Sequence, residues 1–347
     1  MTTAGSCPRP FTLHDTVQLA HGAGGGFSQE LMRQLFLPHF RNPMLESLDD
    51  QARFDTAAGT LAFTTDAHVV DPLFFPGGSI GELAVYGTVN DLAVGGATPL
   101  FLSAAFVLEE GLPLRELERV VVCMADAARR TGVKIVTGDT KVVRKGECDG
   151  LFIITSGIGR IRDGIQLSSR NLQPGDALLV SGSIAEHGMA IMTARHSLSI
   201  ASTIISDCAP VHEMVAALMA VLSSMHAMRD PTRGGVAAAL NELAVASGVG
   251  IVLDEPVIPV RSDVAGACEL LGLNPLHVAC EGRFVLALPE SDADCALEIL
   301  RQFDAGQQAA RIGTVTAEHP GMVVMKTAYG SSRIVELPQG EPLPRIC

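Results

Sequence analysis

Apolar residues in the first half of this chain fall into short continuous runs and into helical spacings. The runs predict buried strands at 61–66, 99–108, 133–141 and 151–158. An amphipathic spacing from Leu114 to Arg130 predicts a helix that Gly132 ends. Ser79 and Glu82 match a capping box, which predicts the start of another helix.

The second half repeats this mixture of strands and helices. We predict strands at 177–181, 251–253 and 284–288, and helices around 211–224, 234–247 and 291–303. Alternation of this kind predicts a mixed α/β (α+β) fold, with sheets covered by helices. A chain of 347 residues exceeds the usual size of one core, about 250–300 residues. We therefore predict two domains, with bounds of 1–17 (leader), 18–160 (N-terminal domain), 161–176 (linker), 177–336 (C-terminal domain) and 337–347 (tail).

Composition narrows the function classes. Hydrophobic residues make up 47% and charged residues 18%, which favours filled cores over disorder. The absence of Trp and a net charge of −13 disfavour nucleic-acid binding by base stacking or phosphate contacts. The eight cysteines include no CxxC pair, which disfavours a local zinc or iron–sulfur site. No signal pattern and no apolar run near about 18 residues is present, so we expect a cytoplasmic protein with free thiols.

The last residues form an unusual segment. Three prolines between Leu337 and Cys347 exclude a helix and favour extended backbone. The result is a semi-stiff tail that ends on a thiol nucleophile and is able to reach a distant site. Frayed termini are common, so a tail without function is the alternative.

Two features suggest a nucleotide site. A glycine-rich turn at 19–26, with Gly24 and Gly25, runs into Ser28, a plausible helix N-cap, and such a turn presents backbone N–H groups to phosphate. No Walker A lysine follows, and a plain flexible turn remains the alternative. Three carboxylates, Asp66, Asp91 and Asp139, are placed at predicted strand or helix ends. Singly each suits a cap or turn, but jointly they predict a Mg²⁺–nucleotide site.

Other polar positions stay open on the residues alone. Lys134 interrupts an apolar strand, where an outward-facing edge residue is the simpler interpretation. Glu281 lies at a strand entrance and equally suits a solvent-facing position. His21 and His187, each in a glycine turn, suit phosphate binding or loop filling. The turn 229–235 is a candidate entry for an anion.

Several motifs together resemble the HypE family of hydrogenase maturation proteins, within the superfamily of aminoimidazole ribonucleotide synthetase and selenophosphate synthetase. They lie at 19–25, 71–78, 90–91, 135–143, 230–235 and 344–347. The terminal Pro-Arg-Ile-Cys motif separates this family from the synthetases. The resemblance implies a PurM-like two-domain architecture whose N-terminal domain forms a homodimer and the ATP site, with the Phe74–Phe75 loop nearby.

The resemblance also implies a reaction. A HypF-like carbamoyltransferase delivers a carbamoyl group to the terminal thiol, and ATP with Mg²⁺ dehydrates it to a thiocyanate. The cyanide then passes to iron on a HypC–HypD-like complex for [NiFe]-hydrogenase. Implied site residues are Cys347 as carrier, Glu281 as base or orienter, Lys134 as charge stabiliser, Asp66, Asp91 and Asp139 as metal ligands, and Gly24, Gly25, Gly138, Thr140 and Lys141 beside the nucleotide.

Two alternatives remain. A small-molecule ATP-dependent synthetase of the same superfamily would leave the tail incidental. A non-enzymatic carrier or scaffold would present Cys347 to partners without using ATP.

Overall fold

The computed structural model describes residues 25–26, 29, 33, 52–56, 59–195, 203–338, 340, 343 and 345–347. Its first half contains β1 (Ala52–Thr56), β2 (Gly59–His68), β3 (Phe74–Phe75), β4 (Gly78–Ser79), α3 (Ile80–Val94), β5 (Ala97–Glu109), α4 (Leu114–Thr131), β6 (Lys134–Val143) and β7 (Leu151–Ile161). Its second half contains β8 (Asp176–Val180), α5 (Glu186–Arg195), α6 (His212–Val221), β9 (Ala227–Arg229), α7 (Gly235–Ser247), β10 (Gly250–Asp254), α8 (Ser262–Leu271), β11 (Val285–Pro289), α9 (Ala293–Leu300), β12 (Ala310–Thr316), β13 (Val323–Lys326) and β14 (Ser332–Ile334).

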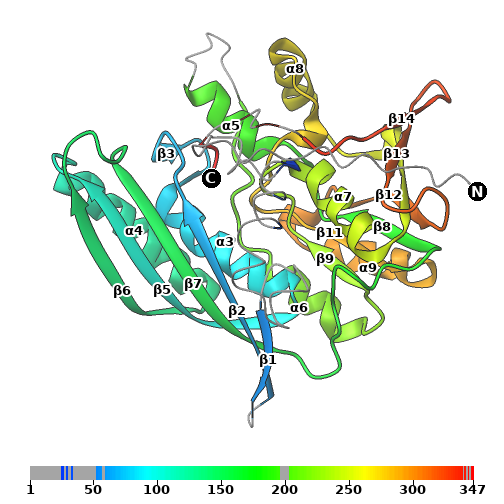
Figure 1. The fold of residues 1–347 in the computed structure, drawn as a ribbon, viewed down its shortest axis with the longest axis horizontal. Coiled ribbons are helices and arrows are strands. Elements are labelled where there is room, and N and C mark those ends of the chain that lie inside the picture. Colours follow the sequence, from blue (N-terminus) through cyan, green and yellow to red (C-terminus); the bar gives the residue numbers. More distant parts are fainter. Residues whose placement is uncertain are drawn as a thin grey trace, which may run out of the picture.

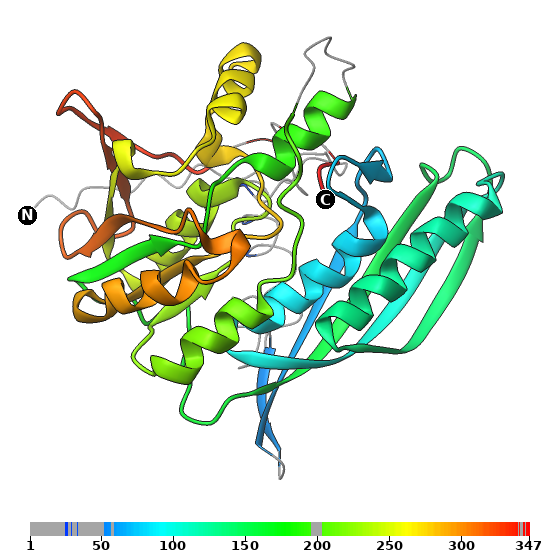
Figure 2. The same cartoon turned by 180° about the vertical axis from the view of Figure 1, so that it is seen from behind.

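The described residues of the first half form a sheet with strand order β1-β2-β7-β5-β6. Helices α3 and α4 pack on one face of this sheet (Figures 1 and 2). Alternation along β2 sends Thr64, Asp66 and His68 toward the helices and Phe63 to the other face, which no described element covers. We call this uncovered side the open face.

The second half forms another sheet, with strand order β14-β13-β10-β12-β8-β11-β9 among the described residues. Strand β8 lies inside it and is buried along its whole length. Helix α3 connects the halves, because it packs on the first sheet and also contacts α6 and β9 (Figure 1). Its residues are almost all buried, so it forms the shared core.

Local signals placed several elements correctly. The Ser79 hydroxyl accepts a hydrogen bond from the Glu82 N–H, which confirms the predicted helix start. Gly132 ends α4 with a φ of 72°, a left-handed conformation that glycine adopts without strain. The predicted mixed α/β fold is confirmed.

Other predictions were wrong in detail. Gly138–Thr140 lies inside β6 rather than at a strand end, because pairing with β5 continues to Val143. His187 lies on α5 instead of in a turn. We did not predict α5, α8 or the strands after residue 310. No helix of the described chain has the length and apolar character needed to cross a membrane. Of the predicted helix after Ser28, Gln29 and Arg33 are described and are helical, and the rest lies outside the described residues.

Candidate active site

The C-terminal tail is docked against the segment that follows β2. The Val69 N–H donates to the Cys347 carbonyl oxygen at 3.0 Å, and the Asp71 N–H donates to that of Arg345 at 3.2 Å. The Arg345 side chain in turn donates to the Val69 carbonyl at 2.9 Å. The last three residues therefore lie alongside residues 69–71, near β3 (Figure 1).

Side chains reinforce this docking. Leu343 and Ile346 are 8% and 4% exposed. Arg195 donates to the Arg345 carbonyl at 2.8 Å, and Arg345 forms an ion pair with Asp149 from the β6–β7 loop. Two apolar anchors and several hydrogen bonds thus hold the tail in one conformation.

Docking brings the terminal thiol to Glu281. The Cys347 thiol lies beside the Glu281 carboxyl group, and burial, together with the negative charge of Glu281, raises the pKa of the thiol well above its usual value. Glu281 is 4% exposed, and its Oε1 has no hydrogen-bond partner among the described residues. Burial, with Asp66 and Asp230 nearby, raises the Glu281 pKa well above its usual value. This shift favours the neutral form of the carboxyl group.

The loop that carries Glu281 is fixed from both halves of the chain. Its N–H donates to Asp207 Oδ1 at 3.1 Å, and its carbonyl accepts from Asn90 Nδ2 at 3.2 Å. Asn90 also donates to the Ala209 carbonyl and accepts from the Val211 N–H. Its amide group is thus fully used in joining α3 to the second half.

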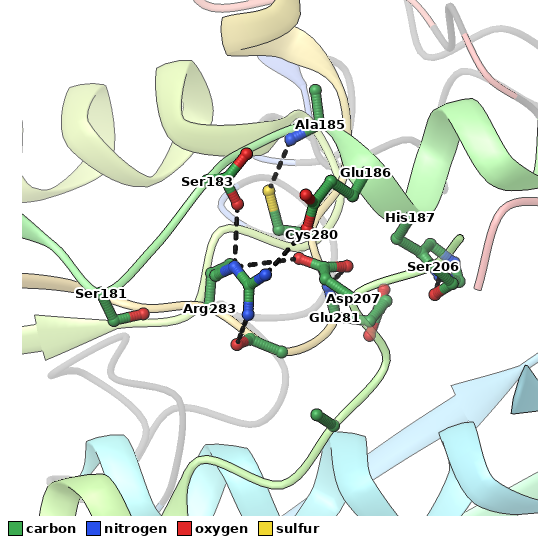
Figure 3. Close-up of polar contacts among 12 residues, drawn as sticks. Ser181, Ser183, Ala185, Glu186, His187, Ser206, Asp207, Cys280, Glu281 and Arg283 are labelled. Carbon is green, nitrogen blue, oxygen red and sulfur yellow. Dashed lines mark hydrogen bonds and ion pairs between the residues drawn. The ribbon is translucent and has the colours of Figure 1, made fainter. Parts of the chain in front are cut away.

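A buried ion-pair network lies behind this loop (Figure 3). Arg283 donates to Glu186 at 2.8 Å and lies 3.7 Å from Asp207. Burial raises the pKa of both carboxyl groups, and Arg283 opposes that shift. The Cys280 thiol accepts from the Ala185 N–H at 3.2 Å. These contacts make a rigid support for Glu281.

Asp66 and Asp91 lie where β2 meets α3. Asp91 accepts a hydrogen bond from Thr64 at 2.8 Å, and Asp66 lies 3.5 Å from the His68 ring. An added Cβ on Gly87 would lie 3.0 Å from Asp66, so the helix approaches this carboxylate closely. The Arg233 guanidinium is near, since the charges of Cys347, Asp66 and Glu281 raise its pKa.

Asp139 is not brought to these two carboxylates within one chain. It pairs with Ala105 on the open face, whereas Asp66 faces the helices. The strands β2 and β6 are three positions apart in the sheet, about 14 Å at normal strand spacing. The described residues contain no group of three His, Cys, Asp or Glu side chains able to hold a metal. The three-carboxylate Mg²⁺ site stays a prediction.

The other predicted site residues are dispersed. Lys134 and Lys141 lie on the edge strand β6, paired with Phe101 and Val107, away from Glu281. Gly138 lies against the Ala104 carbonyl, where an added Cβ would come within 2.1 Å, and Thr140 bonds the Asp139 carboxylate. Gly25 packs against Pro338 at the start of the tail. His21 and Gly24 lie outside the described residues.

Sequence reasoning missed three residues of this site. They are Asn90, Asp207 and Arg195, which hold the loop and the tail through hydrogen bonds. Asn90 stands in the 90–91 motif, in which we had assigned a role only to Asp91. The other two carried no signal, because their partners are distant in sequence.

Comparison with known proteins agrees with this geometry. Residues 48–161 match the N-terminal domain of AIR synthase related proteins, and residues 173–326 match the C-terminal domain. A carbamoyl dehydratase HypE from Cupriavidus necator is 50% identical over 332 residues, 95% of each chain. The chain belongs to the HypE family of carbamoyl dehydratases.

Solved HypE structures share the fold over nearly their whole length. A chain in the crystal structure of a HypE–HypF complex matches with a TM-score of 0.85 at 46% identity, covering 89% of this chain and 99% of that chain. A HypE structure in complex with ATP matches with a TM-score of 0.81 at 48% identity, covering 96% and 100%. The two-domain PurM-like fold is therefore that of HypE proteins, and this chain is an enzyme of hydrogenase maturation.

Proposed function

We propose that this chain uses ATP to dehydrate a carbamoyl group carried on Cys347 while the tail is docked. One observation carries the proposal: the docked tail places the Cys347 thiol beside the buried Glu281 carboxyl group. A carbamoyl group on that sulfur would extend into the same region. The substrate would then be part of the chain, and docking would replace diffusional binding.

The chemistry requires removal of one oxygen and two protons. An amide oxygen leaves poorly, so transfer of the γ-phosphoryl group to it converts it into phosphate, which departs as the C≡N bond forms. The amide nitrogen loses both protons in this sequence. Glu281, once ionised, is the base that takes a proton, and its raised pKa gives it a high proton affinity.

The nucleotide and Mg²⁺ would lie beside the β2–α3 junction. A HypE relative of the same fold is known in complex with ATP. Asp66 and Asp91 supply carboxylate oxygens, which Mg²⁺ prefers as ligands, but they fall short of a complete set in one chain. Bound Mg²⁺ would neutralise phosphate charge. The remaining predicted residues, Asp139, Gly138, Thr140 and Lys141, lie on β6.

A homodimer through the open face would bring those β6 residues into use. The side chains of Phe63 and Phe101 are 40% and 43% exposed on this face. Exposed large apolar side chains that lie together mark an interaction surface. Lys134, Asp139 and Lys141 border the same face by register. In a dimer, this edge of one copy would lie beside the site of the other copy. Lys134 would then act as the predicted charge stabiliser in the site of the neighbouring copy.

Partner proteins need the tail in an undocked conformation. Docked Cys347 is partly buried, its carbonyl accepts from the Val69 N–H and its thiol lies beside Glu281, so a transferase must receive an undocked tail. A HypE–HypF complex is known for a relative. We propose a HypF-like carbamoyltransferase as carbamoyl donor, a HypC–HypD-like iron complex as cyanide acceptor, and a cytoplasmic location.

Mass measurement tests the proposal directly. The protein is carbamoylated by its transferase and then incubated with Mg–ATP. The mass of the C-terminal peptide is measured by mass spectrometry. Loss of one water, absent in Cys347→Ala, is the expected result. ATP hydrolysis without a mass change would favour a small-molecule synthetase. No hydrolysis and no mass change would favour a carrier.

A further inference from the structure

A buried histidine holds the docked tail next to the reacting residue. His187 on α5 is fully buried, and its Nε2 lies 2.8 Å from the carbonyl oxygen of Ile346. Its Nδ1 lies 2.7 Å from the Ser206 hydroxyl oxygen. Figure 3 shows the two side chains next to each other, beside the network that supports Glu281. The contact falls one residue before Cys347.

The partners fix the hydrogen positions in this chain of contacts. A carbonyl oxygen only accepts, so Nε2 carries the hydrogen and Nδ1 has the lone pair. Ser206 then donates its hydroxyl hydrogen to Nδ1, while its oxygen accepts from the Cys208 N–H at 3.0 Å. The ring is therefore held in one tautomer. Burial lowers the His187 pKa to about 4, which agrees with a neutral ring.

Packing fixes the orientation of the ring as well. Phe75 contacts it edge to face, with centroids 5.4 Å apart at 86°. Undocking of the tail would take the carbonyl acceptor away from a donor at a fully buried position. Loss of a partner there costs free energy, which favours the docked conformation.

We propose that His187, held in one tautomer by Ser206, is the positioning residue that fixes the docked tail through the Ile346 carbonyl. A free thiol would lack the carbonyl oxygen that this contact needs, and the structure shows this chain's own tail supplying it. The inference rests on the proposed function, since it makes the docked tail the reactive one.

The test measures docking apart from catalysis. The full chain is treated with iodoacetamide, and the rate of Cys347 alkylation is read from the mass of the C-terminal peptide. His187→Phe keeps a ring but removes the donor, so alkylation should become about five- to tenfold faster. His187→Gln returns an amide N–H near the Nε2 position and should stay within about threefold of the wild-type rate. Thr193→Val, on the same helix and bonded only within it, is the matched control and should match wild type.

Dehydration of the carbamoylated protein gives the second measurement. In His187→Phe, kcat should fall by a similar factor while the KM for ATP stays unchanged, because only the position of the tail is altered. A wild-type alkylation rate in His187→Phe would overturn the inference. So would a rate in His187→Gln as fast as in His187→Phe, which would assign the effect to ring packing.

The two proposals fail in different ways. Faster alkylation with unchanged dehydration would support the His187 contact and contradict the docked tail as the reactive state. A wild-type protein that loses no water from its carbamoylated tail would contradict the proposed function, whatever the alkylation rates are.

Discussion

At the scale of single residues, burial sets the chemistry of the site. Glu281 has its backbone bonded on both sides, while its Oε1 has no partner in the described part of the chain. The surrounding carboxylates raise its pKa further. A buried carboxyl group of this kind is held where a reacting group could meet it.

Glu281→Gln should lower the single-turnover rate of dehydration by about 10²-fold or more, because an amide cannot act as the base. In wild type the rate should rise with pH, since the ionised form of Glu281 is the base and burial raises its pKa well above the usual value. Quenched-flow mass analysis across pH measures both. The exposed Glu318→Gln is the control, and a pH-independent wild-type rate would contradict the role.

Asn90→Ala should destabilise the protein by about 2–4 kcal/mol, because it leaves the carbonyls of Glu281 and Ala209 and the N–H of Val211 without partners at a buried position. Urea unfolding measures the loss. Asn171→Ala removes one side-chain hydrogen bond, to the Gln166 carbonyl, and should lower the free energy of unfolding by clearly less. Equal losses in the two variants would count against the bridging role of Asn90.

His187 should make stability depend on pH. Its folded pKa of about 4 lies below 6.5, the usual pKa of histidine, so the unfolded chain binds the proton more tightly. Stability is therefore lost as pH falls from about 6.5 toward 4, with about 2 kcal/mol lost from this group at pH 5. The free energy of unfolding in urea is measured for wild type and for His187→Gln at pH 7 and pH 5. The change in the difference between the two proteins isolates the contribution of His187. An unchanged difference would show that the buried ring titrates normally.

At the scale of elements, the tail lies along residues 69–71 through two backbone hydrogen bonds, with a turn at Arg345, whose φ is 54°. Its contacts come from the segment after β2, from the β6–β7 loop through Asp149, from α5 through Arg195 and His187, and from the loop that carries Glu281. Only the backbone pairing is independent of side chains. The side-chain contacts make docking specific for this tail.

Arg345→Ala should weaken docking, because it removes the ion pair with Asp149 and the bond to the Val69 carbonyl. Alkylation of Cys347 should become several-fold faster, because such partly exposed contacts contribute roughly 1 kcal/mol to the free energy of docking. Arg333→Ala removes an exposed ion pair with Glu255 and serves as the control. Equal alkylation rates in the two variants would show that Arg345 does not hold the tail.

At the scale of the whole molecule, the open face of the first sheet has no cover among the described elements. The large apolar side chains exposed on this face suit burial against a second copy of the chain. The same face borders Asp139 and Lys134, so assembly and nucleotide binding would be linked.

Phe63→Asp should dissociate the proposed homodimer, raising its dissociation constant at least about tenfold by burying a charge at the interface. Sedimentation equilibrium measures the mass. Leu114→Asp, a more exposed position at the start of α4, should leave the mass unchanged. A monomeric wild type, or a dimeric Phe63→Asp protein, would contradict the interface.

The sequence by itself determined the features that depend on neighbours along the chain. Ser79 and Glu82 start α3, Gly132 ends α4, and apolar runs mark β2, β5 and β7 because caps and alternation act within a few residues. The resemblance of its motifs to the HypE family also identified the fold and the terminal cysteine.

Only the tertiary structure decided what those residues do together. Asn90 bonds Glu281 across 191 positions, and His187 bonds Ile346 across 159, distances at which no local pattern carries information. Register placed Asp139 on the opposite face from Asp66, although both had looked like strand-end carboxylates. The raised pKa of Glu281 likewise follows from burial, which depends on how the two halves of the chain pack.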